Sequence, residues 1–430
     1  MVNLFRVTIL CCLCMIATQV NAHGEDISSA DPAFNIMEKI NEARSLLEKS
    51  NGLGYDEHRV TARRKNGARQ SDRTPPVISR RVLYRQQIAL AILDKKTGCI
   101  IEKRYWLDTE EIIRANRMRN TREDNTGPAK MPRFHPYIAS RNFEVVVNWW
   151  NTFNSDLSVK NKGQDNAEQY VVLANKYLIP NRGGSAHGSH RNGSRYLDIV
   201  YVPYSRALHS EAMIDAGKAF LNNQVAQAFT DLREKQVKSR GYSGRLATDT
   251  MSENFIKCLL INEHSDPGWM LSTKDKGRWV AERFLILLAA NGERAFRFSD
   301  SRTGALGIAQ IMPETYAHVV NIYPGADLIG DVDRGRAEMA NAIKASILVC
   351  DDLQSAVVRN MRDDSSSFQQ NYRRLFDAKS EEEVDEIRAA MYNGGPKKYI
   401  LATGSINPRV QETVSYVKKF NFIRSLNMFE

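Results

Sequence analysis

Cysteine is scarce in this chain, and half of the cysteines lie near the N-terminus. Of the six cysteines, Cys11, Cys12 and Cys14 fall close together and the other three are isolated. None of those three has a second cysteine or a histidine at metal-site spacing, so the sequence predicts no metal centre. Cys258 and Cys350 lie in apolar, helix-like segments. We therefore expect buried thiols there, with one disulfide as the alternative.

An apolar segment long enough to cross a bilayer is missing from the N-terminus. Residues 7–17 are apolar, but a span needs about 20 such residues. Arg6 precedes this segment and Val20-Asn21-Ala22 follows it, the pattern of a secretory signal peptide. We expect residues 1–22 to be removed and the protein to work in the periplasm or cell envelope. A retained membrane anchor is the alternative.

Acidic residues are almost lacking between Arg59 and Arg85. This stretch holds nine basic residues and one acid, Asp72. We expect residues 23–81 to form one short helix, over 32–50, followed by a flexible basic linker. The linker, together with the net charge of +10, favours a weak contact with an anionic polymer or membrane surface. The export signal argues against a nucleic-acid partner.

Residues 82–205 have a different character. Two apolar, β-branched runs at 82–94 and 99–107, separated by Lys-Lys-Thr-Gly, predict two strands joined by a turn. Residues 143–153 and 196–202 add strand-like runs, so we expect a small α+β region. Between them, His187 and His190 lie in a Gly-rich loop without nearby metal-ligand partners, and we expect a polar loop. Core packing is the expectation for three tryptophans that could otherwise stack on sugars: Trp106, Trp149 and Trp150.

Helical patterns dominate from residue 206 onwards. We expect a helical connecting region over 206–274, with a short helix at 252–261 that is ended near Asp266-Pro267, a stretch that also contains Glu263. A strongly apolar helix over 280–290 leads into Glu293, where desolvation would disfavour the charged form of a carboxyl group. Ser380 and Glu383 form a capping-box pattern for a helix that Gly394 is placed to end.

The segment after Glu293 resembles a known signature. Residues 293–315 read E-x7-S-x2-GA-x-G-x2-Q-x-MP-x-T, and residues 391–396 (MYNGGP) and 408–420 (PRVQETVSYVKKF) follow in order. Together they are similar to the soluble lytic transglycosylase (SLT, lysozyme-like) domain. The resemblance implies a mainly α-helical lysozyme-like domain at 275–430, after the smaller α+β region. It implies Glu293 as the catalytic acid and base. The implied substrate-binding residues are Ser301, Gly304, Gln310, Met312, Tyr392 and Asn393.

The activity implied by this resemblance is cleavage of peptidoglycan glycan strands at the MurNAc–GlcNAc bond. One Glu protonates the bond, and the muramyl C6 hydroxyl then closes a 1,6-anhydro ring, without metal or cofactor. Envelope or secretion-apparatus proteins are further candidate partners. A goose-lysozyme-like hydrolase, with Asp300 as a second acid, is one alternative. Arg294 and Ala309 depart from the family pattern and keep a non-catalytic wall-binding scaffold open. Glu263 is the rival acid, although no Gly-rich turn follows it at the right distance.

Overall fold

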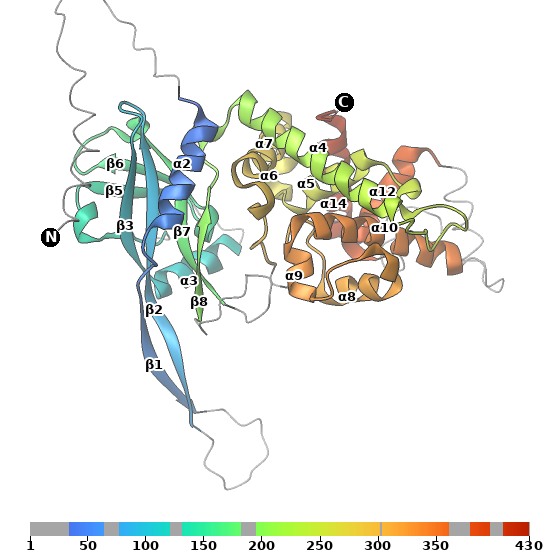
Figure 1. The fold of residues 1–430 in the computed structure, drawn as a ribbon, viewed down its shortest axis with the longest axis horizontal. Helices are drawn as coiled ribbons and strands as arrows, with labels where there is room; N and C mark the ends of the chain where they lie inside the picture. Colours follow the sequence, from blue (N-terminus) through green and yellow to red (C-terminus); the bar gives the residue numbers. More distant parts are fainter. Residues whose placement is uncertain are drawn as a thin grey trace, which may run out of the picture.

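A computed structural model describes residues 34–63, 77–120, 131–181, 195–301, 303–360, 379–395 and 407–429. The fold is α+β, as the sequence predicts, with a sheet-containing part up to about residue 205 and a helical part after it (Figure 1). The expected signal peptide, the loop with His187 and His190, and Pro396 lie outside the described residues. Within them, no helix combines the length and apolarity needed to cross a membrane.

Antiparallel strands form the N-terminal part. In the larger sheet the order is β4-β3-β2-β7-β8, and β1 pairs with the outer half of β2. A separate hairpin joins β5 and β6. The bounds of the larger sheet are β1 (Tyr55–Arg63), β2 (Val77–Asp94), β3 (Ile100–Asp108), β4 (His135–Pro136), β7 (Tyr170–Pro180) and β8 (Tyr196–Tyr201). The hairpin comprises β5 (Phe143–Trp149) and β6 (Asp156–Asn161). The strands expected from 82–94, 99–107, 143–153 and 196–202 are confirmed.

The C-terminal half of strand β2 is buried on both faces, which explains the uninterrupted apolar run at 88–93. Ala89, Ala91 and Leu93 belong to one core with helix α2 (Ile36–Lys49), whose residues Ile40, Ala43 and Leu47 are fully buried. The alternate residues Ile88, Leu90 and Ile92 belong to a second core with Ile112 of helix α3 (Thr109–Asn120). Because successive side chains of a strand point to opposite faces, two helices cover one strand.

The basic segment after α2 differs from the expected flexible linker. Its described residues form a two-stranded ribbon in which the backbone of Arg59 pairs with Arg81 and that of Arg63 with Val77. The ribbon extends away from the rest of the sheet (Figure 1). For these described residues the linker expectation was wrong, because a two-stranded ribbon needs no buried face of its own when one of its strands continues into the core. Here β2 supplies that core strand. Residues 64–76 lie outside the described part of the chain.

The helical part is larger than the sequence analysis predicts. Helix α4 packs closely on α7, since a Cβ atom at Gly217 would lie 2.1 Å from the Leu285 carbonyl oxygen. Residues 206–274 are therefore part of the same core and do not form a separate connecting region. The bounds are α4 (Glu211–Glu234), α5 (Glu253–Glu263), α6 (Pro267–Met270), α7 (Lys274–Asn291), α8 (Pro313–Ile322), α9 (Val332–Ala337), α10 (Met339–Asn360), α12 (Glu381–Gly394) and α14 (Gln411–Ser425). Cys258 and Cys350 are buried free thiols, as expected, whereas Cys99 is exposed.

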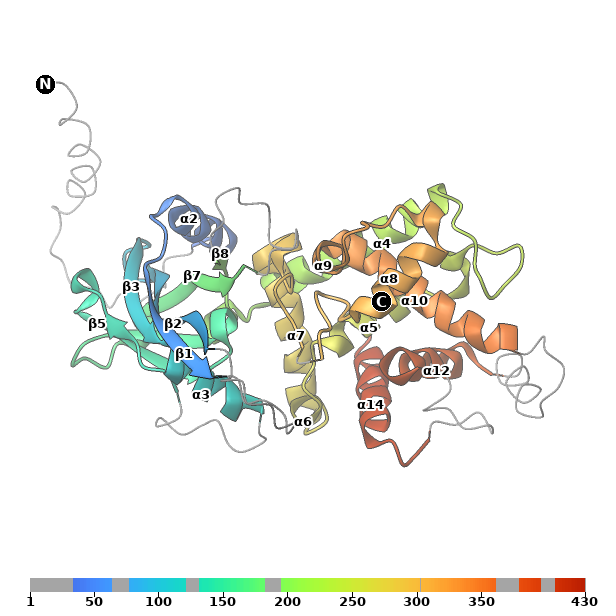
Figure 2. The same ribbon diagram turned by 90° about the horizontal axis from the view of Figure 1, so that it is seen from below.

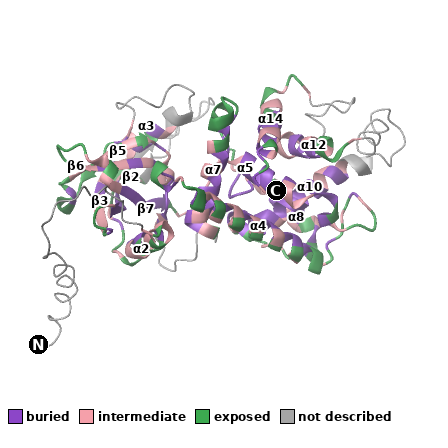
Figure 3. Cartoon of the chain, turned by 90° about the horizontal axis from the view of Figure 1, so that it is seen from above, coloured by how far each residue is buried: buried purple, intermediate pink, exposed green. Residues whose placement is uncertain are grey.

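The two parts share an interface along α7. Figures 2 and 3 show this helix between the sheet and the other helices. At its end, the Asn291 side chain binds the backbone of Val202 like a neighbouring strand. Its Nδ2 donates to the Val202 oxygen at 2.9 Å, and its Oδ1 accepts from the Val202 nitrogen at 2.9 Å. Tyr201 and Leu288 belong to one continuous core, so sheet and helices are packed together.

Candidate functional site

Glu293 does not occupy the position that the sequence analysis predicts. It lies in a short 3-10 turn after α7 (Gly292–Arg294), and its side chain is exposed. The last helical residue, Asn291, points inward instead, and the chain then turns and carries Glu293 to the surface. Next to it, Arg294 forms an ion pair with Glu48 of α2. The expectation of a desolvated carboxyl group at Glu293 was therefore wrong.

Glu263, the rival acid, lies in the environment predicted for Glu293. It is the last residue of α5 and is half-buried, so protein surrounds it while part of it remains open to solvent. Desolvation raises the pKa of Glu263 to about 7, against the opposing effects of Tyr416 and Lys419. The Tyr416 hydroxyl donates a hydrogen bond to Glu263 Oε1. A carboxyl group with this pKa can both give and take a proton near neutral pH.

Two tyrosines accompany this carboxyl group. Burial raises the pKa of Tyr416 and Tyr392 well above the usual value, and the negative charge of Glu263 adds to the effect. Both hydroxyls therefore stay protonated and can only act as donors toward a negative centre. Tyr416 comes from α14 and Tyr392 from the last turn of α12. The sequence analysis named Tyr392 but not Tyr416.

Lys419 fastens α14 to the end of α5. Its buried Nζ donates to the carbonyl oxygens of Asn262, at 2.9 Å, and Ser265, at 2.6 Å. Burial lowers the pKa of Lys419 to about 8, and the nearby acids Glu263 and Asp266 partly oppose this. A cation at a helix C-terminus satisfies carbonyl groups that lack helical partners. The position of Tyr416, one helical turn before Lys419, is fixed by the same contact.

The predicted ligands Ser301 and Gln310 are used within their own loop. Ser301 Oγ accepts from the Ala305 backbone nitrogen at 2.9 Å. Gln310 Nε2 donates to the carbonyl oxygens of Ser299, at 3.1 Å, and Gly307, at 2.8 Å. These side chains shape the Gly-rich loop. Their predicted hydrogen bonds to sugar therefore compete with hydrogen bonds that fold the loop.

Arg336 supports the loop from behind and was not foreseen in the sequence. This buried residue on α9 donates from Nη1 to the carbonyl oxygens of Gly304, at 2.6 Å, and Ile311, at 3.1 Å. Its Nη2 is paired with Asp333 at 2.6 Å. The predicted contact residue Met312 follows directly, half-buried, as the N-cap of α8. Arg336 contacts the loop only because the chain folds back on itself, so no sequence pattern could have identified it.

The loop meets Glu263 through neighbouring side chains. His264 Nε2 lies 3.0 Å from the Ile308 carbonyl oxygen, and its ring stacks on Phe296 with centroids 4.1 Å apart. Burial lowers the pKa of His264 to about 4, so the ring is neutral and Nε2 carries the proton that the carbonyl accepts. The Tyr392 hydroxyl donates to the Ala309 carbonyl oxygen at 2.6 Å. All three sequence blocks thus converge on Glu263.

The helix that carries Tyr392 has the predicted start and a slightly different end. Ser380 and Glu383 form the capping box at its first turn. The C-cap is Gly395 and not Gly394, because the helix runs one residue further than predicted. Asn393, a predicted substrate contact, accepts a hydrogen bond from Thr413 Oγ1 at 2.8 Å through its Oδ1. Its side chain therefore joins α12 to α14.

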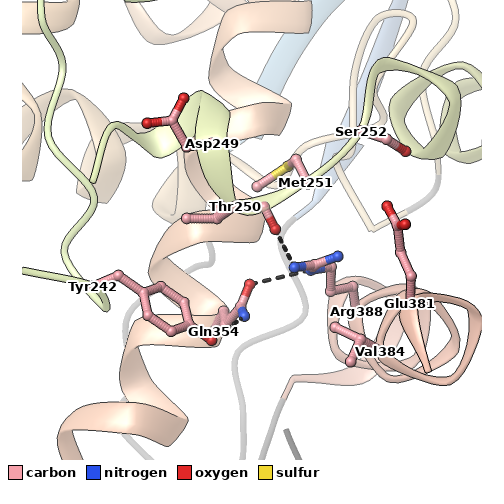
Figure 4. A pocket seen from close by; sticks show the side chains of 9 residues that line it. All are labelled: Tyr242, Asp249, Thr250, Met251, Ser252, Gln354, Glu381, Val384 and Arg388. Atoms are coloured by element: carbon pink, nitrogen blue, oxygen red, sulfur yellow. Dashed lines mark hydrogen bonds between the residues drawn. The ribbon is translucent and has the colours of Figure 1, made fainter. Parts of the chain in front are cut away.

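A separate pocket lies at the opposite end of α5. It has a volume of about 430 Å³ and opens beside Ser252, the N-cap of that helix (Figure 4). The buried Arg388 donates to the Thr250 carbonyl and, at 3.1 Å, to Gln354 Oε1. It also pairs with Asp385 at 2.8 Å. These bonds hold the guanidinium group between three elements, and the pocket contains neither Glu263 nor the Gly-rich loop.

Groups that could hold a metal lie elsewhere in the described part of the chain. Asp108, Glu111 and His135 place one potential ligand atom each within 4.8 Å of one another, in the N-terminal part. The rival second acid Asp300 is exposed in the Gly-rich loop. The site around Glu263 is built from its carboxyl group, the phenols of Tyr416 and Tyr392, the Lys419 amine, the His264 ring and backbone carbonyls. Searches against family models, curated proteins and solved structures found no match to this chain.

Proposed function

We propose that this protein is a peptidoglycan lytic transglycosylase and that Glu263 is its acid and base. The observation that carries the proposal is the half-buried carboxyl group with a pKa of about 7. Tyr416 donates a hydrogen bond to this carboxyl group, and Tyr392 donates one to the Ala309 carbonyl oxygen of the Gly-rich loop. The resemblance of the three sequence blocks to the SLT domain supports the same assignment, with Glu263 in place of Glu293.

The chemistry follows from a single carboxyl group. Protonated Glu263 donates its proton to the oxygen that joins MurNAc C1 to GlcNAc, and that bond breaks. The resulting carboxylate accepts the hydrogen bond from Tyr416, which stabilises its negative charge. Glu263 then removes the proton from the muramyl C6 hydroxyl, whose oxygen bonds to C1 and closes the anhydro ring. The cycle returns Glu263 to its protonated form and consumes no water, metal or cofactor.

The products of peptidoglycan digestion test this proposal. Purified peptidoglycan incubated with the full chain should release muropeptides with 1,6-anhydro ends, identified by mass spectrometry. Reducing ends would instead establish a hydrolase that activates water. Wall binding without any released muropeptide would identify the scaffold alternative. Either of these two results would overturn the transglycosylase assignment.

Removing the Tyr416 hydroxyl should move the pH dependence of cleavage. Glu263 must be protonated to act as acid, so activity should fall as pH rises through about 7. The hydrogen bond from Tyr416 lowers the pKa of Glu263, so Tyr416→Phe should shift this fall to higher pH. A hydrogen bond to a charged group corresponds to a shift of about one pH unit. The pH profile of initial rates measures it.

Tyr392→Phe is the matched control for that shift. Its hydroxyl donates to the Ala309 carbonyl and not to Glu263. This variant should lower the rate through the loop while leaving the midpoint of the pH profile in place. An equal shift in both variants, or in neither, would contradict the role assigned to Tyr416.

The proposal also covers location and partners. We infer export to the periplasm or cell envelope from the N-terminal signal pattern, and glycan strands as the substrate. The ribbon of β1 and β2 carries exposed Arg59 and Arg81, and we infer that it contacts anionic polymer or lipid head groups. Proteins of an envelope or secretion apparatus are further candidate partners of the protein, and nucleic acid is not among them.

A further inference from the structure

Trp269 is unusually exposed for a tryptophan. It lies on the short helix α6, and its exposed fraction is 56%, while the other four tryptophans are buried or half-buried. Large aromatic side chains are normally covered, and an uncovered one often marks a binding surface. The neighbouring Leu271 is also exposed, at 40%.

The exposed ring is the outer member of an ordered stack. Trp269 stacks on Trp279 of α7, with centroids 6.0 Å apart and planes inclined by 30°. Trp279 stacks in turn on His209, 6.2 Å away and tilted by only 3°, and meets the edge of Tyr204 at 5.3 Å. The other face of the Trp269 ring is therefore available to a ligand, and Trp279 holds the ring in place.

Polar contacts anchor the inner end of this stack. The two ring nitrogens of His209 lie 2.9 Å from the Tyr204 hydroxyl and 3.0 Å from Glu282 Oε2. The Arg283 guanidinium lies 4.4 Å from the Trp149 ring centroid and 5.0 Å from that of Tyr204. A surface held in this way loses little conformational entropy when a ligand binds.

The stack begins close to the proposed acid. Trp269 follows Glu263 by six residues, so even a fully extended chain would separate them by only about 20 Å. Asp266 between them accepts from the Trp269 backbone nitrogen at 3.0 Å, and Ser265 accepts from Lys419 at 2.6 Å. The segment between Glu263 and Trp269 is therefore held in place by both hydrogen bonds.

We propose that Trp269 is a sugar-stacking platform that binds a second ring of the glycan strand cleaved at Glu263. This inference rests on the proposed function. The C–H bonds on one face of a pyranose ring pack well against an indole, whose face carries partial negative charge. We assign the ring bound here as N-acetylglucosamine, because it lacks the bulky lactyl-peptide branch that N-acetylmuramic acid carries on its C3 oxygen. Trp269 then acts in binding and not in the chemical step.

Kinetics on soluble, uncrosslinked glycan strands test the platform. Trp269→Ala should raise KM about five- to tenfold and leave kcat within about twofold, since stacking energy is lost equally before and in the transition state. Trp269→Phe should recover part of the affinity. Leu271→Ala, which removes an exposed apolar neighbour but no ring, should match the wild type. Unchanged KM in Trp269→Ala would overturn the proposal, as would an equal effect of Leu271→Ala.

A binding measurement separates this inference from the proposed function. In Glu263→Gln, an oligomer of β-1,4-linked N-acetylglucosamine should quench or shift the tryptophan emission, and the added change Trp269→Ala should abolish that signal. If the wild type cleaves nothing but the signal depends on Trp269, the proposed function fails and the platform stands. If the wild type cleaves and the signal is the same without Trp269, the platform fails.

Discussion

Glu263→Gln should abolish glycan cleavage, whereas Glu293→Gln should leave it within about twofold of the wild type. General acid–base catalysis contributes about 10²- to 10⁴-fold to a rate, and Glu263 would serve in both proton transfers. We therefore expect a loss near the upper end of that range. Glutamine keeps the size of the side chain and can still accept the hydrogen bond from Tyr416. Initial rates of anhydro-muropeptide release from purified peptidoglycan provide the measurement.

The paired variant makes this result informative. Glu293 is exposed and lies beyond the far end of α7, so its substitution should change neither folding nor the site. Circular dichroism and thermal melting should show both variants folded. Full activity in Glu263→Gln would contradict the assignment of Glu263 as the catalytic acid. Loss of activity in Glu293→Gln alone would restore the assignment that the sequence pattern suggests.

Gly307→Ala should destabilise the helical part by about 2–5 kcal/mol. Gly307 has φ of +78°, a conformation that costs alanine about 1–2 kcal/mol. A Cβ atom there would also lie 2.0 Å from the Arg336 backbone oxygen, so the loop or α9 must move. Overpacking of this kind adds about 1–3 kcal/mol. Urea unfolding followed by circular dichroism measures the change.

Gly304→Ala is the matched control in the same loop. Its φ is +97°, but a Cβ atom there meets nothing closer than Pro313 at 4.0 Å. It should therefore carry the conformational cost without the clash. Equal losses in the two variants would show that close approach to Arg336 is unimportant. Cleavage should also fall in Gly307→Ala, because the adjoining Ile308 and Ala309 carbonyls contact His264 and Tyr392.

The sequence could predict which blocks form the site but not which acid serves it. The spacing of the Gly-rich signature fits Glu293, eight residues before Ser301. In the fold, the intervening α6 and α7 occupy residues 267–291 and return the chain to the end of α5. Glu263 and the loop therefore meet in space although 38 residues separate Glu263 from Ser301. Spacing along the chain cannot reveal such a return.

Most helices and the strands at 82–94 and 99–107 could be predicted, because local periodicity and β-branched apolar runs indicate them. Strand β7 could not, since its apolar run is interrupted by Asn175 and Lys176. Distant backbone carbonyl oxygens accept a hydrogen bond from each of these two side chains. Asn175 Nδ2 donates to the Phe153 oxygen at 2.6 Å, and Lys176 Nζ donates to the Ser50 oxygen at 3.0 Å. Tertiary contacts of this kind override local propensity.

The bond between Asn291 and Val202 bears on how the protein can be divided. Cutting the chain near residue 206 would remove Tyr201 and other sheet residues from the core that also contains Phe284 and Leu288 of α7. It would also leave the amide of Asn291 without its strand partner. A fragment that contains only the helical part would thus expose apolar surface and self-associate. The sheet is thus part of the core that buries α7.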